Sequence, residues 1–273
     1  MSPTPPKQSF AKRVRRFVAW SFSKFQDYRS CPAKAAYKHI DKLGAPPEVS
    51  EAKVDQLLKG RTKGSMKEIP QDTDPLIKGS VVHAMAEQFT KGNLKRLPTE
   101  LTTFKKEFEK VRKHEVMTEK FWGFRSDWSL VPPNTYQAWL WVRVDACYCE
   151  APGKYVLLDY KTGRAPSPPK PGVAPSWNQE KYQQHEEQRE IYAIALFAVY
   201  PDAKEVRAEH WYTDAGIEYK NTYNREKDFD RLKTKWEKMV KPMMTDTSFV
   251  PLPSTSACKF CEFAKSRGGP CRF

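Results

Sequence analysis

Helical spacing of hydrophobic positions dominates the first part of the chain. Ser21 is placed to cap a helix whose apolar face begins at Phe25, and a second helical segment follows Cys31-Pro32. The segment 44–75 is polar and interrupted by Gly and Pro, which predicts a loop or a mobile lid. The chain therefore begins its regular structure with helices.

A further helix is indicated by a longer apolar stripe. Val82, Ala86 and Phe89 follow the i, i+4, i+7 spacing of a buried helix face, which predicts a helix over residues 79–90. Residues 102–120 carry many charged side chains and are predicted to form a charged helix.

An alternating pattern replaces the helical period between residues 138 and 161. Two alternating runs, 138–149 and 155–161, are joined by the turn Ala151-Pro152-Gly153, which predicts an antiparallel β-hairpin. The elements expected after it are a Pro-rich linker over 165–175, a helix from about 178 to 200, a strand over 206–213 and a cysteine-rich loop after 251. Helices and strands together predict an α/β protein.

Charge narrows the class of partner. Lys+Arg number 47 against 33 Asp+Glu, a formal net charge of +14, and the basic positions include a run at Lys12, Arg13, Arg15 and Arg16. Such a balance favours a polyanionic partner, foremost nucleic acid. With 39% apolar and 13% aromatic residues, the chain is neither collagen-like nor wholly disordered.

Membrane insertion and secretion are not expected. The longest apolar run, 191–200, is about half the length that a membrane-spanning helix needs. The short apolar stretch 17–22 is too brief for the core of a signal peptide. We therefore expect an intracellular protein, cytoplasmic or nucleoid-associated, whose thiols bind metal or pack rather than form disulfides.

The hairpin concentrates the candidate chemistry on one face. Asp159 and Lys161 are two residues apart on a strand, so their side chains project to the same side, and Asp145 on the paired strand can face them. Two carboxylates bind a hard divalent cation, and a nearby lysine can orient water or neutralise charge on a phosphate. The alternative for an isolated D-x-K is a salt-bridged surface hairpin.

Five motifs in order add to this pattern. They are Ser21-Phe22-Ser23 continuing to Tyr28-Arg29-Ser30-Cys31-Pro32; Gly79-Ser80-Val81-Val82-His83; Val144-Asp145; Leu158-Asp159-Tyr160-Lys161-Thr162-Gly163; and Gln188-Arg189-Glu190-Ile191-Tyr192. Together they resemble the RecB-like branch of the PD-(D/E)XK nuclease superfamily, including its CRISPR-associated exonucleases and AddB-type subunits of helicase-nucleases. The resemblance covers residues 21–271, with 44–75 and 165–177 unmatched. It implies a restriction-endonuclease-like mixed sheet flanked by helices.

The resemblance also implies roles for individual residues. His83, Asp145, Asp159 and the Tyr160 backbone carbonyl would bind Mg²⁺ or Mn²⁺, while Lys161 would serve the attacking water. The helix pair Gln188 and Tyr192 would touch the lysine, the water or the DNA backbone.

Several of these positions have ordinary alternatives. His83, beside an apolar stripe, can equally be a core histidine, and Glu87, one turn on, can orient it or be solvated. Glu119 stands where the family often has an acidic residue, with a solvated charge at a helix end as the alternative. Val142 departs from the family, which usually has glycine there.

The cysteines form a second candidate site. Cys258-x-x-Cys261 and Cys271 lie near the C-terminus, and Cys31 lies in the opening helical region. Four clustered thiolates hold either tetrahedral Zn²⁺ or an iron–sulfur cluster, and one C-x-x-C does not choose between them. The resemblance favours a [4Fe-4S] cluster that staples the N-terminal and C-terminal segments, with structural Zn²⁺ as the alternative. Cys147 and Cys149 are expected to be packed thiols.

The domain organisation expected from these features is simple. Residues 1–20 form a basic N-terminal arm and 21–273 a single nuclease domain, with its core at 79–213 and a cysteine-rich segment at 251–273. The activity expected is that of a metal-dependent DNA exonuclease acting on single-stranded or free ends in recombination, repair or processing. The alternatives are an endonuclease and a catalytically silent nucleic-acid-binding scaffold. No G-x-x-x-x-G-K-[ST] motif is present, so unwinding would require a helicase or recombination partner.

Overall fold

The computed structural model describes residues 14–43, 69, 73–174 and 176–273. Nearly all of the predicted loop 44–75 therefore lies outside the described residues, as do Lys12 and Arg13 of the basic run. The chain divides into two compact units, Pro46–Met239 and a smaller one made of Met1–Ala45 with Val240–Phe273. The prediction of one domain over 21–273 stays a prediction.

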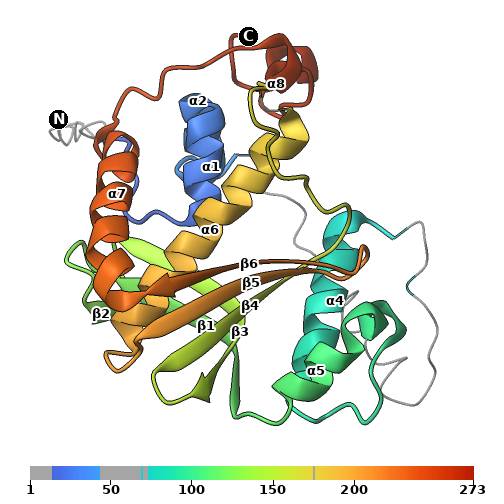
Figure 1. The fold of residues 1–273 in the computed structure, drawn as a ribbon. Coiled ribbons are helices and arrows are strands. Elements are labelled where there is room, and N and C mark those ends of the chain that lie inside the picture. The colour runs from blue at the N-terminus through green and yellow to red at the C-terminus, as the bar shows by residue number, and fades with distance from the viewer. Residues whose placement is uncertain (1–13, 44–68, 70–72, 175) are drawn as a thin grey trace, which may run out of the picture. The chain divides into compact units, whose positions relative to one another are not determined.

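The larger unit is built on a six-stranded sheet in the order β2-β1-β3-β4-β5-β6. The strands are β1 (Val116–Phe124), β2 (Leu130–Val131), β3 (Leu140–Ala151), β4 (Lys154–Lys161), β5 (Glu205–Tyr212) and β6 (Ile217–Asn224). Strands β4 and β5 are parallel and all other neighbours are antiparallel. Helix α6 (Trp177–Val199) connects the parallel pair, because parallel neighbours need a long crossover. The mixed sheet flanked by helices confirms the predicted fold class (Figure 1).

The predicted hairpin is strands β3 and β4. Its turn contains Gly153 at φ 73°, a left-handed conformation that suits glycine. The antiparallel register pairs Cys147 with Leu157 and Ala146 with Leu158. Continued by one residue, this register sets Asp145 opposite Asp159, so the sheet itself brings the two carboxylates to one place.

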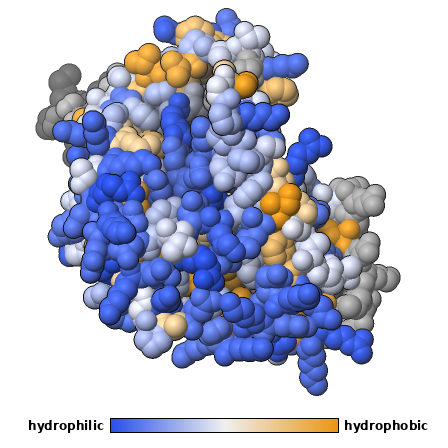
Figure 2. All heavy atoms as spheres, viewed as in Figure 1, coloured by the Kyte–Doolittle hydropathy of each residue, from blue (hydrophilic) through white to orange (hydrophobic). Residues whose placement is uncertain are grey.

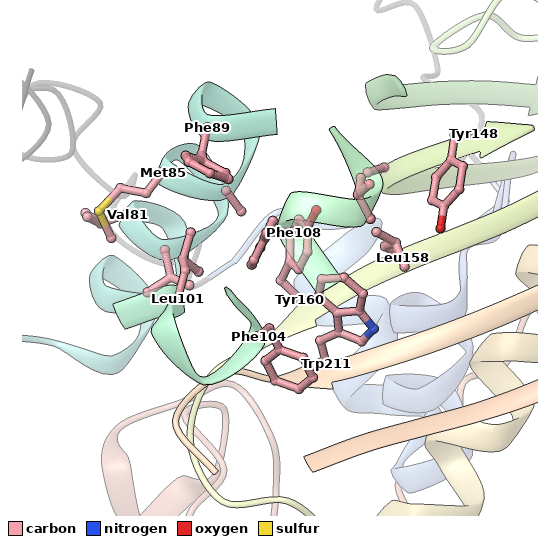
Figure 3. Packing of buried hydrophobic residues seen from close by; sticks show 14 of the residues in the cluster. Val81, Met85, Phe89, Leu101, Phe104, Phe108, Tyr148, Leu158, Tyr160 and Trp211 are labelled. Atoms are coloured by element: carbon pink, nitrogen blue, oxygen red, sulfur yellow. The ribbon is translucent and has the colours of Figure 1, made fainter. Parts of the chain in front are cut away.

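One face of the sheet packs against α4 (Pro75–Thr90), a 3₁₀ helix (Thr99–Phe104) and α5 (Lys105–Val111). Figure 3 shows this buried cluster, in which Phe104 stacks on Trp211 with ring centroids 5.0 Å apart and Phe108 stacks on Tyr160 at 5.6 Å. Since side chains alternate along a strand, the neighbours of Tyr160 and Trp211, including Asp159 and His210, face the opposite side. The core thus anchors the strands from which the polar residues project.

The predicted helix over 102–120 is wrong in its second half, whereas residues 102–111 are helical. The helical turns end at Val111, and β1 begins at Val116 and pairs with β3 from Val116↔Tyr148 onward. Pairing with β3, far along the sequence, outweighs the helical preference of the charged segment. Strand β6 and helix α7 (Arg225–Thr245) were not predicted from the sequence.

The smaller unit contains α1 (Phe22–Ser30), α2 (Pro32–His39), the end of α7, the short helix α8 (Thr255–Lys259) and a 3₁₀ turn (Lys265–Arg267). Ser21 caps α1 as predicted, accepting a hydrogen bond from the Lys24 N–H. Phe249 packs edge-on against Phe17 and Tyr28, which joins the N-terminal and C-terminal segments of this unit. Arg15 of the basic run is paired with Asp41.

A tight turn near the C-terminus depends on Gly269. A Cβ at this position would meet the Phe263 backbone at 2.3 Å, closer than any side chain tolerates. The same turn lets the Cys271 N–H donate to the Phe263 oxygen at 3.0 Å. Glycine therefore allows the chain to fold back and bring Cys271 near the helix that carries Cys258.

A mean hydropathy of −0.74 leads one to expect a mainly hydrophilic surface. On the face in Figure 2, hydrophobic residues form small patches separated by hydrophilic ones. Among the helices of the described ranges, none combines the length and apolar character needed to cross a membrane.

Candidate active site

The candidate site begins where β3 and β4 carry their two buried aspartates. The Tyr160 backbone N–H donates to Asp145 Oδ2 at 2.7 Å, which fixes the Asp145 carboxylate across the hairpin. Asp159 and Asp145 are both nearly inaccessible to solvent. Two carboxylates that are nearly buried need polar or charged partners, and each of them has such partners.

Asp159 belongs to a closed ring of one ion pair and three hydrogen bonds. Lys161 Nζ lies 2.6 Å from Asp159 Oδ2 and donates to Gln188 Oε1 at 3.0 Å. The Gln188 amide donates to the Tyr192 hydroxyl at 2.6 Å, and that hydroxyl donates to Asp159 Oδ1 at 2.7 Å. The predicted pair on α6 and the predicted pair on β4 are therefore in direct contact. The ring fixes the lysine ammonium beside the carboxylate.

A second group surrounds Asp145. His83 Nδ1 of α4 lies 3.2 Å from Asp145 Oδ1. Potential ligand atoms of His83, Glu119 and Asp145 all lie within 4.8 Å of one another, the only such group of three among the described residues. One nitrogen and carboxylate oxygens are a donor set that Mn²⁺ accepts and that Mg²⁺ tolerates.

Glu119 reaches this group through an unusual backbone conformation. It is a strand residue of β1, so its interpretation as a charge at a helix end is wrong. Its flanking residues Thr118 and Lys120 pair with Ala146 and Val144, which places Glu119 across from Asp145. Its φ of 49° lies in the left-handed region, which costs free energy for a residue with a side chain. The strained residue is thus itself a member of the candidate metal group.

The charges of the site act on one another. Burial opposes protonation of His83, but its hydrogen bond to Asp145 and the negative charges of Asp145 and Asp159 outweigh burial and raise its pKa. Burial also disfavours ionisation of Asp159, yet the Lys161 ammonium and the Tyr192 hydroxyl hold the pKa of Asp159 below its usual value. The pKa of Glu119 is raised by burial and by the Asp145 charge. Dense negative charge of this kind is what a divalent cation would neutralise.

The residues behind Asp159 were missed by the sequence analysis. His210 of β5 pairs with Asp159 in the parallel register, and its Nε2 lies 3.7 Å from Asp159 Oδ2. The fully buried Arg189 of α6 contacts His210 Nδ1 at 3.1 Å and donates to Asn221 at 2.6 Å. The signal that could have found His210 is its position on the strand paired with Asp159, which depends on knowing the register.

Other predicted side chains have clear local partners. Glu87 pairs with Lys91 at 2.5 Å, and Val142 is buried in β3 opposite Trp122. Cys147 is fully buried, whereas Cys149 is exposed and so is not the packed thiol that was predicted. Because β3 places successive side chains on opposite faces and its pairing shifts after Cys149, the second thiol is left at the surface.

In the smaller unit, the four remaining cysteines line one cavity of about 190 Å³. They are Cys31, Cys258, Cys261 and Cys271, the four chosen from the sequence. Each is a free thiol, and the Leu252 N–H points at Cys31 Sγ at 3.4 Å. The N-terminal and C-terminal thiols therefore converge on a common space.

The chain is similar to a known protein family and to solved structures. No curated protein matches the chain. Two similar solved structures are the protein SSO0001, with 16% identity, a TM-score of 0.41 and coverage of 96% of this chain and 91% of the other, and a protein from Eubacterium rectale described as a putative exonuclease, with 8% identity, a TM-score of 0.45 and coverage of 100% and 95%. A family model matches residues 19–266, nearly the whole described chain, and on that match the chain belongs to the PD-(D/E)XK nuclease superfamily.

Proposed function

We propose that this nuclease is a divalent-metal-dependent deoxyribonuclease that hydrolyses phosphodiester bonds from free, single-stranded ends. The observation that carries the proposal is the hydrogen-bonded ring of Asp159, Lys161, Gln188 and Tyr192 beside the His83–Asp145 pair. A catalytically silent scaffold would have no need to keep a partly buried lysine fixed between a carboxylate and an amide.

The metal-binding role is assigned to His83, Asp145, Asp159 and the Tyr160 carbonyl. The close group of His83, Glu119 and Asp145 adds Glu119 to the candidates. Their nitrogen and oxygen donors fit Mg²⁺ or Mn²⁺. When bound, such a cation supplies an acidified water and positive charge near the phosphate.

The protein's own groups then position the reactants. Lys161 presents its ammonium beside Asp159, where it can hold the attacking water and offset negative charge growing on the phosphate oxygens. Gln188 and Tyr192 hold the Lys161 ammonium and the Asp159 carboxylate in fixed positions relative to each other. The water oxygen attacks phosphorus and releases one proton to solvent, the phosphorus–oxygen bond to the leaving sugar breaks, and that sugar oxygen takes up one proton from solvent.

The substrate assignment rests on charge and on the family. A net charge of +14 favours binding to nucleic acid, with affinity that falls as salt rises. Cleavage from DNA ends suits a role in recombination, repair or processing of DNA, with a helicase or recombination partner supplying any unwinding. An endonuclease is the alternative that the test must exclude.

The test is digestion of end-labelled single-stranded and double-stranded DNA with Mn²⁺ or Mg²⁺, with free or blocked ends. Release of terminal products from linear strands, with survival of a closed single-stranded circle, is expected. Rapid loss of the circle would favour an endonuclease. Asp159→Asn and Lys161→Ala should abolish cleavage while DNA binding persists; cleavage at the wild-type rate by Asp159→Asn would overturn the assignment.

We further propose that Cys31, Cys258, Cys261 and Cys271 hold a [4Fe-4S] cluster that staples the two ends of the smaller unit. Four thiols around one cavity are a complete ligand set for such a cluster. The Leu252 N–H directed at Cys31 Sγ supplies the type of hydrogen bond that stabilises a thiolate ligand.

Structural Zn²⁺ held by the same four thiolates is the alternative that measured iron and sulfide content must exclude.

A further inference from the structure

Helix α6 carries a strip of side chains that leads from its exposed beginning to the candidate active site. An α-helix turns about 100° per residue, so positions spaced by four, four, three and four share one face. The strip consists of Trp177, Lys181, His185, Gln188 and Tyr192, which fall within a sector of about 80°. Its last two members contact Lys161 and Asp159 directly.

The acidic and basic residues of this stretch of α6 lie on different faces of the helix. The acidic residues of the same stretch lie outside the sector of the strip; they are Glu180, Glu186, Glu187 and Glu190. Within the strip the charged residue is Lys181. A negatively charged strand that follows this face would therefore meet no carboxylate of α6 itself before it reaches the metal group.

Exposure decreases along the strip toward the site. Trp177 is 74% exposed, whereas Tyr192 at the other end is buried. Lys181 Nζ lies 5.5 Å from the centre of the Trp177 ring, over its face. Trp177 is an unusual residue to leave in water, and three other tryptophans of the chain are buried or partly buried: Trp20, Trp122 and Trp128.

The exposed beginning of the strip is held in place by hydrogen bonds. The Asn178 amide donates to the Ser167 hydroxyl at 3.1 Å, and the Gln179 amide contacts the Pro168 carbonyl at 3.4 Å. These bonds tie the first turn of α6 to the preceding Pro-rich segment. Trp177 is thereby presented on an anchored helix start.

We propose that this strip is the track for the single-stranded DNA substrate, with Trp177 as a platform on which one base stacks and Lys181 as a phosphate contact. The inference rests on the proposed nuclease function. Aromatic rings that stack on bases, combined with positive charge along the backbone, are the usual means of holding single strands without reading sequence.

The helix sets the distance between the platform and the chemistry. Trp177 and Gln188 are eleven residues apart, which corresponds to about 16 Å along the axis. At about 3.4 Å per stacked nucleotide, this span is about five nucleotides. The stacked base is therefore about five nucleotides from the scissile phosphate.

The test combines a protein variant with a damaged substrate. Full-length wild type, Trp177→Ala and Trp177→Phe are compared on single-stranded oligonucleotides that carry one abasic site at each of positions two to nine from the cleaved end. Wild-type kcat/KM should fall about tenfold when the abasic site is about five nucleotides in, the loss expected for one stacked base. Trp177→Ala should lose the same factor on the intact strand and nothing more on that abasic strand, whereas Trp177→Phe should behave nearly as wild type.

A matched control is Tyr136→Ala, because Tyr136 is 87% exposed in the same unit and lies outside the strip. An equal loss for Tyr136→Ala, or wild-type kinetics for Trp177→Ala on every substrate, would overturn the track. If the wild type cleaves no substrate, the proposed function fails. The track is then judged by fluorescence anisotropy of a labelled twelve-nucleotide strand without divalent cation, where equal affinity of Trp177→Ala and wild type would refute it.

Discussion

His210 lies directly across from Asp159 in the parallel pair of β4 and β5, with its Nε2 3.7 Å from Asp159 Oδ2. Arg189 can only donate hydrogen bonds, so His210 Nδ1, 3.1 Å away, must be the acceptor. Burial, which outweighs the Asp159 charge, lowers the pKa of His210 well below its usual value. A neutral ring that accepts at Nδ1 carries its proton on Nε2, which is the nitrogen that faces Asp159.

Replacing His210 should therefore impair catalysis through Asp159. His210→Phe keeps an aromatic ring but loses the N–H, and we expect kcat to fall by about tenfold or more and the Mn²⁺ concentration for half-maximal activity to rise. His210→Gln retains an amide N–H and should recover most of the loss. Equal activity of His210→Phe and wild type, with both proteins folded, would show that His210 only fills the core.

The hairpin and the ring around Asp159 could be predicted because their signals are local. The alternation of polar and apolar residues predicted strands β3 and β4, and helical spacing placed Gln188 and Tyr192 on one face of α6. The strand that carries Glu119 was missed, since its pairing with β3 joins positions distant in sequence. His210 was missed for the same reason: the register of a parallel pair depends on the crossover and its packing.

The Tyr192 hydroxyl should matter for rate more than for stability. Tyr192→Phe removes the donor to Asp159 Oδ1 and the acceptor for Gln188, so we expect a fall in kcat of about tenfold with little change in KM. Its matched control is Tyr155→Phe, which loses a Tyr–Asp hydrogen bond of 3.1 Å to Asp202 at the far end of β4. Both variants should lose about 1 kcal/mol of unfolding free energy, but only Tyr192→Phe should lose activity. Comparable kinetics for the two would remove Tyr192 from the site.

The His83 group can be tested by metal titration. His83→Ala should raise the Mn²⁺ concentration needed for half-maximal cleavage by at least tenfold, because a nitrogen ligand is lost. Glu119→Gln should shift the same titration if its carboxylate binds metal. His114→Ala, which removes a histidine stacked on Tyr148, is the control and should leave the titration unchanged. A wild-type titration for His83→Ala would leave it as a core residue.

An ion-pair network across the sheet predicts a pH dependence of stability. Glu150 accepts from Arg207 at 2.8 Å and from Lys110 at 2.7 Å, and these partners lower its pKa to about 2. Because the folded-state pKa is below the unfolded value of about 4.5, the stabilisation is present above pH 4.5 and is lost as pH falls toward 2.

Glu150→Gln should accordingly lower the free energy of unfolding by about 1 kcal/mol at pH 7, a figure that allows for solvent screening. The difference from wild type should shrink between pH 4.5 and pH 3, as measured by urea denaturation. Glu205→Gln, from a more exposed pair 3.8 Å from Lys154, should show a much smaller effect at pH 7. A Glu150→Gln deficit that is the same at pH 7 and pH 3 would contradict the network as its source.

The cysteine cavity predicts a coloured protein. Purified without oxygen, the protein should be brown, with broad visible absorbance and acid-labile sulfide, because thiolate-bound iron–sulfur clusters absorb there. Cys31→Ala should lose as much iron as Cys261→Ala, since each supplies one ligand to the same cavity from opposite ends of the chain. Cys149→Ala is the matched control, because Cys149 is an exposed thiol outside the cavity and its loss should leave the iron content unchanged. A colourless protein with one bound zinc would refute the cluster and keep the four-thiol staple, whereas full iron content in Cys31→Ala would show that the N-terminal helices are not tied to the metal.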